Sequence, residues 1–123
     1  MPGEVDKVIL LPRYTTLVGA TDFITAPINV RPYATANISV WRGEILGTND
    51  SFTLIVQESP DLTEWKTLES FSTSAGDEDT EAVAFTMDWI RVKVTLTGSD
   101  PSVSCWCVGE FARRELARTA TRA

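Results

Sequence analysis

The sequence predicts an all-β protein: a single antiparallel β-sandwich of about eight strands, arranged like a jelly roll. Apolar and polar residues alternate in several short segments, most clearly from Trp89 to Thr97. Turn signals recur at intervals of about ten residues, which is typical of sandwiches and barrels. No helix of useful length is predicted before residue 112. The 123 residues suffice for one domain, 1–123, with a core of its own.

Residues 52–68 form the predicted central hairpin. Phe52, Leu54 and Val56 fall on one face at the period of two that a half-buried strand requires. The run Ser59-Pro60-Asp61 then ends the ladder, because proline has no N–H to donate and serine and aspartate hydrogen-bond their own backbone. Alternation resumes at Trp65, so we expect two paired strands with an acidic tip.

The N-terminal residues 1–13 are predicted to form an extended arm. Their apolar run is either a strand covered on both faces or an arm that adds to another subunit; it consists of Val8, Ile9, Leu10 and Leu11. Strands are predicted over 14–18, 23–32 and 34–46. Pro27 and Pro32 mark the second of these as an edge strand. Ile38 and Val40 share the inner face of the third, and residues 47–51 are a predicted polar connection.

After the hairpin, the small and acidic residues 72–81 predict a loop, and residues 82–87 predict a strand. The next strand, 89–97, has the inward residues Ile90, Val92, Val94 and Leu96. A turn at 98–101 leads to the last strand, 103–111, whose inner face carries Val103, Cys105, Cys107, Gly109 and Phe111. Residues 112–123 are a predicted short, arginine-rich tail.

The cysteines are predicted to be reduced thiols in the core. Cys105 and Cys107 are two residues apart, so their Cα atoms would be ~6.5–7 Å apart on one strand face, at or beyond the limit for a disulfide. A zinc site would need more ligands, and the chain has no histidine. The acids at 76–81 are candidate calcium ligands, but they lack EF-hand spacing and a solvated acidic loop is the alternative.

Composition also bears on partners. The formal net charge of −6 argues against general nucleic-acid binding, which depends on neutralising phosphates. No apolar run approaches the ~20 residues that span a bilayer, and the N-terminus lacks the features of a signal peptide, so we expect synthesis in a cytoplasm and no membrane partner. The tail concentrates positive charge in Arg113, Arg114 and Arg118, as either a frayed terminus or a docking arm.

The sequence predicts no enzyme and no cofactor. Without histidine, the common general base and the usual triads are absent. Glu58 with Asp61 or Glu64 could form a carboxylate pair of the kind that hydrolyses glycosides. Acids at a hairpin tip, however, usually serve solubility and turn formation.

The tryptophans offer three alternatives. Trp41 and Trp89 lie opposite the predicted core faces, so they could form a sugar-binding platform, pack under loops or the second sheet, or bury in a subunit interface. Tryptophan and arginine are enriched in interfaces, and Arg91 follows Trp89 closely.

A family resemblance adds to this interpretation. The run IVQESPD (55–61) followed by Trp65 resembles a "VQxSxD…W" hairpin of small β-sandwich proteins in tailed-phage virions, and DWIRVKV (88–94) resembles the strand that usually follows. Within that group, the chain is similar to a capsid decoration (cement) protein. The resemblance implies homotrimers that bind the major capsid protein at the capsid surface and stabilise the lattice, without catalytic residues. The alternative is a carbohydrate-binding or tail- or baseplate-associated module.

In the decoration hypothesis, both ends of the chain and the outward tryptophans contact neighbouring subunits. The expected interface residues are Val8, Ile9, Leu10, Leu11, Trp41, Trp89, Arg91, Arg113, Arg114 and Arg118.

Overall fold

The computed structural model describes residues 5–114, which form eight β-strands and no helix; no membrane-spanning helix is therefore found among them. The strands are β1 (Val5–Val18), β2 (Asp22–Ile24), β3 (Ile28–Asn29), β4 (Tyr33–Arg42), β5 (Leu46–Ser59), β6 (Lys66–Phe71), β7 (Glu78–Ala84) and β8 (Trp89–Arg113). The predicted all-β fold is confirmed.

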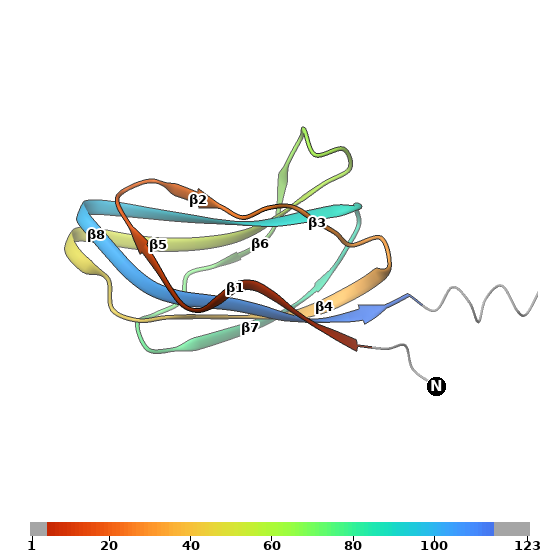
Figure 1. Cartoon of the computed structure of the whole chain (residues 1–123), viewed down its shortest axis with the longest axis horizontal. Helices are drawn as coiled ribbons and strands as arrows, with labels where there is room; N and C mark the ends of the chain where they lie inside the picture. The colour runs from red at the N-terminus through yellow and green to blue at the C-terminus, as the bar shows by residue number, and fades with distance from the viewer. Residues whose placement is uncertain (1–4, 115–123) are drawn as a thin grey trace, which may run out of the picture.

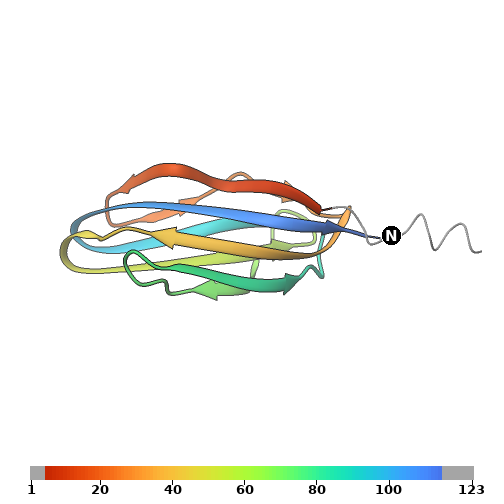
Figure 2. The same cartoon turned by 90° about the horizontal axis from the view of Figure 1, so that it is seen from below.

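The long strand β8 takes part in both layers of the sandwich (Figures 1 and 2). Its first half pairs with β5 on one side and with β2 and β3 on the other, and β6 extends this first sheet beyond β5. Its second half lies between β1 and β4, and β7 extends this second sheet beyond β4. All pairs are antiparallel. The orders β2/β3–β8–β5–β6 and β1–β8–β4–β7 are those of a jelly roll, as predicted.

The turn predicted at 98–101 is a bend within β8, where the strand passes from the first sheet to the second. Gly98 has φ 126° and Asp100 has φ 50°, values that a regular strand does not adopt. The start of β5 packs tightly against this bend: a Cβ added to Gly47 (φ 143°) would lie 2.8 Å from the Ser99 carbonyl oxygen. Only glycine fits that approach.

The core lies between the two sheets and consists of the inward residues that the alternation predicts. Ile38 and Val40 of β4 are fully buried, and so is Leu54 of β5. From β8, both predicted inner faces are buried: Ile90, Val92, Val94, Leu96, Val103, Cys105, Cys107 and Phe111. Both thiols are free, as predicted. The Phe111 ring packs over Gly109, leaving no room there for a Cβ.

Several element predictions are wrong at their boundaries; the strand predicted over 23–32, for example, is the two short strands β2 and β3. Residues 5–13 are not an extended arm. They belong to β1 and pair with β8, because this pairing buries Leu10 and Leu17 of β1 in the core. Residues 47–51 belong to β5 rather than to a connection, although the register shifts there. Residues 78–81 form the start of β7 rather than a loop, because an edge strand tolerates exposed acids. Residues 1–4 and 115–123, most of the predicted tail, lie outside the described residues.

Candidate interaction surface

The outer face of the second sheet, here called the outer face, carries two stacked tryptophans. Trp41 of β4 lies directly opposite Trp106 of β8 in the register. The two rings are nearly parallel, at an interplanar angle of 13°, with centroids 6.4 Å apart. The Arg13 guanidinium carbon lies 4.7 Å from the Trp106 ring centroid, a cation–π contact. Trp106 is therefore nearly covered, whereas Trp41 is partly exposed.

An irregularity in β1 places Arg13 and its neighbour above this pair. The register of β1 against β8 shifts twice between Ile9 and Thr15. The Thr15 hydroxyl donates a 2.6 Å hydrogen bond to the Pro12 carbonyl, and Tyr14 adopts φ 66°. Tyr14 is 92% exposed. A bulky residue with positive φ is uncommon and is often found where function or tight packing requires it.

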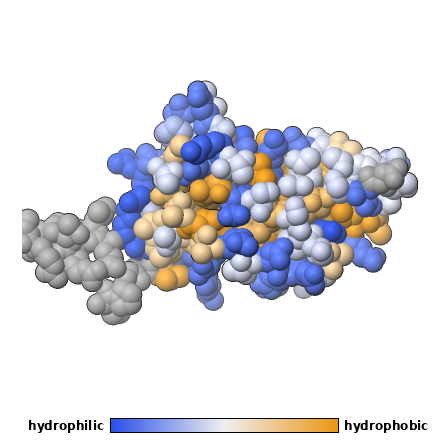
Figure 3. All heavy atoms as spheres, turned by 180° about the vertical axis from the view of Figure 1, so that it is seen from behind, coloured by the Kyte–Doolittle hydropathy of each residue, from blue (hydrophilic) through white to orange (hydrophobic). Residues whose placement is uncertain are grey.

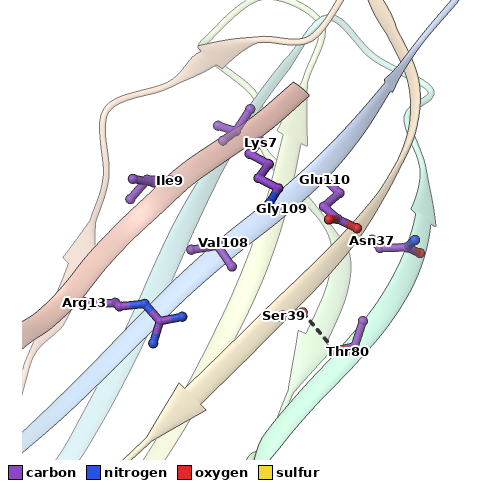
Figure 4. Close-up of a pocket in the computed structure, with 10 residues that line it drawn as sticks. Lys7, Ile9, Arg13, Asn37, Ser39, Thr80, Val108, Gly109 and Glu110 are labelled. Carbon is purple, nitrogen blue, oxygen red and sulfur yellow. Dashed lines mark hydrogen bonds between the residues drawn. The ribbon is translucent and has the colours of Figure 1, made fainter. Parts of the chain in front are cut away.

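Two hollows open on the outer face. One, of about 350 Å³, lies beside the tryptophan pair and is lined by Arg13, Tyr14, Trp41, Ser104 and Trp106. The other, of about 600 Å³, runs across β1, β8, β4 and β7 (Figure 4). Its lining is mixed: Ile9 and Val108 are apolar, Lys7 and Glu110 are charged, and the Ser39 and Thr80 hydroxyls hydrogen-bond each other at 2.8 Å. The outer face can therefore make apolar, stacking and polar contacts.

The structure does not bring Trp41 and Trp89 together. Trp89 begins β8 and pairs with Asn29 and Ser59, so it belongs to the first sheet, on the opposite side of the sandwich. Arg91 is also on that side, where its Nε donates to Gln57 Oε1 at 2.8 Å and its guanidinium carbon lies 4.2 Å from the Trp65 ring centroid. A single contact cannot bury both tryptophans unless it wraps around the molecule.

The predicted hairpin tip is closed by its own hydrogen bonds. Ser59 Oγ accepts from the backbone N–H of Leu62 at 2.8 Å, and Asp61 Oδ1 accepts from those of Thr63 and Glu64 at 2.9 and 3.1 Å. The bonds from Glu64 and Thr63 hold the pKa of Asp61 below its usual range. Trp65 Nε1 donates back to the Leu62 carbonyl at 3.2 Å. The residues of the hairpin motif therefore have a structural role here.

The carboxylate pair considered for glycoside hydrolysis is not arranged for that chemistry. Glu58 is 1% exposed, and its two carboxyl oxygens accept hydrogen bonds from the Thr86 backbone N–H at 3.2 Å and hydroxyl at 2.7 Å. Asp61 is engaged in the turn, as described above. Both carboxyl groups serve the fold.

The strand alternation of β7 separates the acids considered for calcium. Asp79 and Glu81 share the side of Val83, whereas Glu78 points to the other side with Thr80. Within residues 5–114, no group of three or more acidic or cysteine side chains could hold a metal ion.

Arg113 and Arg114, at the end of β8, join distant segments of the molecule. Arg113 Nη2 lies 2.8 Å from Asp6 Oδ2, and the Tyr33 hydroxyl donates to the same oxygen at 2.6 Å. The Tyr33 hydrogen bond and then Arg113 hold the pKa of Asp6 below its usual range, and the same bond raises the pKa of Tyr33. Arg114 Nε donates to the Arg31 carbonyl. Arg118 lies outside the described residues.

The four apolar residues expected at an interface divide into two groups. Leu10 is buried, and Val8 and Leu11 pack against the core. Of the four, only Ile9, at 65% exposed, points to solvent. Sequence reasoning missed three residues of the outer face: Arg13, Tyr14 and Trp106. The outward position of Trp106 could have been predicted from its alternation with Cys105 and Cys107. The irregularity in β1 that places Arg13 and Tyr14 on the outer face has no periodic pattern in the sequence.

The comparisons with known proteins concern the fold. No protein-family model matches the chain, and no curated protein matches its sequence. Among solved structures, the PBSX exported protein XepA has a TM-score of 0.67 at 13% identity, over 89% of this chain and 38% of that one. This chain thus spans about two fifths of XepA. The SPBc2 prophage-derived protein YomS has a TM-score of 0.55 at 9% identity, over 89% and 96% of the two chains.

A viral protein shares the fold as well. VP2 in a subviral particle of infectious bursal disease virus has a TM-score of 0.56 at 9% identity, over 89% of this chain and 33% of that one. At such identities, these similarities establish the β-sandwich fold alone. The class of protein that fold and pairing define is a double-sheet jelly roll.

Proposed function

We propose that this chain is a non-enzymatic structural protein of a tailed-phage virion, of the capsid decoration (cement) type. It is made in the host cytoplasm, associates as a homotrimer and binds the major capsid protein on the outer capsid surface. The observation that carries the proposal is the β-sandwich fold of this chain, which is similar to the folds of the prophage-derived protein YomS and of VP2 in a subviral particle.

The acidic side chains that could act as catalysts instead hydrogen-bond within the fold, which supports a binding role over a catalytic one. Within the described residues, Glu58, Asp61 and Asp6 are each engaged in hydrogen bonds that join distant segments or close a turn. The two thiols are buried. The outer face, by contrast, presents Tyr14 and Ile9 to solvent, next to two hollows. Such a surface suits contact with another protein.

The test is co-sedimentation of the purified full-length chain with capsids that lack it. We expect saturable binding and greater resistance of the decorated capsids to heat, measured by DNA release. Tyr14→Ala should weaken binding, whereas Leu62→Ala at the hairpin tip, also exposed, is the matched control. Absence of binding to capsids of the phage that encodes the chain would contradict the decoration proposal.

One observation favours a second candidate, a glycan-binding tail or baseplate module. The hollow beside the partly exposed Trp41 combines aromatic rings, on which a sugar can stack, with an arginine and a serine, which can hydrogen-bond its hydroxyls. This candidate predicts glycan binding by the isolated chain, measured on a glycan array and lost in Trp41→Ala.

A further inference from the structure

We propose that the two free edges of the second sheet pair with each other between copies of this chain, β1 of one copy adding antiparallel to β7 of the next. The inference deepens the proposed function, since it names the contact by which the chain self-associates. Within residues 5–114, β1 pairs only with β8 and β7 only with β4. Each therefore keeps one unpaired edge, which is a template for another strand.

The strand directions suit this pairing. Strands β1 and β4 both run antiparallel to β8, so they run parallel to each other; β7 is antiparallel to β4 and therefore opposite to β1. Rotation about an axis along the strands preserves their directions. The β7 edge of a rotated copy then meets β1 in the antiparallel sense, which is the slightly more stable ladder. Figure 2 shows β1 and β7 on the two margins of this sheet.

The register also places regular segments at equal heights. One row across the sheet runs Ile9–Val108–Ser39–Thr80, and a second runs from Val5 to Ala84. Rotation about an axis parallel to the strands does not move a row along that axis. Residues 5–9 of one copy therefore lie level with residues 80–84 of its neighbour. Neither segment contains a register shift. The irregular part of β1 begins only after Ile9.

The side chains at these edges complement each other. Val5 and Ile9 are 58% and 65% exposed, and Ala82 and Ala84 on β7 are small and exposed. Along the side of the molecule where β6 and β7 lie, hydrophobic residues reach the surface between hydrophilic ones (Figure 3). Pairing would remove the two aliphatic side chains of β1 from water.

Charge selects a head-to-tail contact over a two-fold one. The exposed charges of β1 are Lys7 and Arg13, since Asp6 is paired with Arg113; those of β7 include Glu78 and Glu81. Two β7 edges would repel each other, as would two β1 edges, whereas β1 attracts β7. Heterologous contacts of this kind close into rings when the rotation permits, and a trimer is one such ring.

The experiment is the solution mass of the full-length chain by light scattering during gel filtration. We expect a multiple of 13.5 kDa, three-fold for a trimer. Ile9→Asp should reduce the mass to that of one chain. Val18→Asp is the matched control: Val18 is 68% exposed on the same strand but lies level with Ser102, beyond the reach of β7. A circular dichroism melt of each variant verifies folding.

Charge reversal gives an independent test. Lys7→Glu with Arg13→Glu should yield monomers, and so should Glu78→Lys with Glu81→Lys, while the variant carrying all four changes should associate again. Glu44→Lys with Glu64→Lys, at exposed sites away from both edges, controls for net charge. A monomeric wild-type chain, or an oligomer that survives Ile9→Asp and both reversals, would overturn the edge-pairing proposal.

Capsid sedimentation separates the two proposals. An oligomer that responds to the edge variants but ignores capsids overturns the decoration role and leaves the edge contact standing. A monomer that sediments with capsids does the opposite.

Discussion

The two thiols illustrate how the environment of single residues fixes their chemistry. Cys105 and Cys107 point into the core from β8. Burial raises the pKa of Cys105 to about 11, and burial followed by the proximity of Cys105 raises that of Cys107 to about 12. Because the thiolate is the reactive form, both side chains are inert near neutral pH.

We therefore expect neither thiol to react with a chromogenic disulfide reagent at pH 8 in the folded protein, and both to react once denaturant unfolds it. The raised values also set a pH dependence. The contribution of the neutral thiols to the stability of the fold is complete below the unfolded pKa of about 8.5. It is lost as the pH rises toward the pKa values of the folded protein. Rapid labelling of the native protein would show that β8 opens locally.

Asp61 gives a residue-scale test in acid. Its folded pKa is depressed, so its contribution to stability is present above the unfolded value of about 3.9 and is lost as the pH falls through the folded value. We expect Asp61→Asn to lower the melting temperature at pH 7 and to matter much less at about pH 2. An equal effect at both pH values would mean that the carboxylate charge is irrelevant to the turn.

At the scale of the element, β1 requires the most revision relative to the sequence. Its apolar run is part of the sandwich, so its residues alternate sharply in importance. Leu10 is 7% exposed and Ile9 is 65% exposed. We expect Leu10→Ala to lower the free energy of unfolding by about 2–5 kcal/mol, as for other buried leucines, and Ile9→Ala to change it little. Urea denaturation monitored by tryptophan fluorescence measures both.

Equal effects of the two substitutions would place the run outside the sheet, as an arm. Each should be measured at low protein concentration, because Ile9 is also the residue proposed to contact a second copy.

What could be predicted from sequence is what local pattern determines. The inner face of β5 and both inner faces of β8 follow from alternation, and the hairpin tip follows from Ser59, Pro60 and Asp61. The acidic start of β7 was predicted to be a loop because its acids alternate with small polar residues, so that no apolar face appears before Val83. The run Val8–Leu11 has no alternation at all, so its partner β8 could not be inferred.

The candidate surface was harder to predict than the core. Trp41 was expected to face outward and does, but its contact with Trp106 depends on the β4–β8 register. Trp89 has a similar local pattern and lies on the other sheet. The sequence does not state which sheet a strand joins, because pairing between distant segments is decided by the packing of the whole chain.

At the scale of the molecule, most of the pairing joins segments that are far apart in the sequence. The first strand pairs with the last, and β4 and β5 both pair with β8, although other strands lie between them in the sequence. Folds dominated by such distant pairings fold slowly, on the order of milliseconds to seconds. Stopped-flow refolding monitored by the four tryptophans should give rates in that range. Complete refolding within microseconds would contradict this expectation.

The pairing of β1 with β8 has a mechanical consequence. Val5 lies opposite Ala112, so the chain enters and leaves the sandwich at the same end. A force that pulls these two points apart acts across the ladder rather than along it. Such a force would break the β1–β8 hydrogen bonds one after another, beginning at Val5 and Ala112, and so separate β1 from the sheet. A neighbour that held only one of these two ends would instead leave the ladder unstressed.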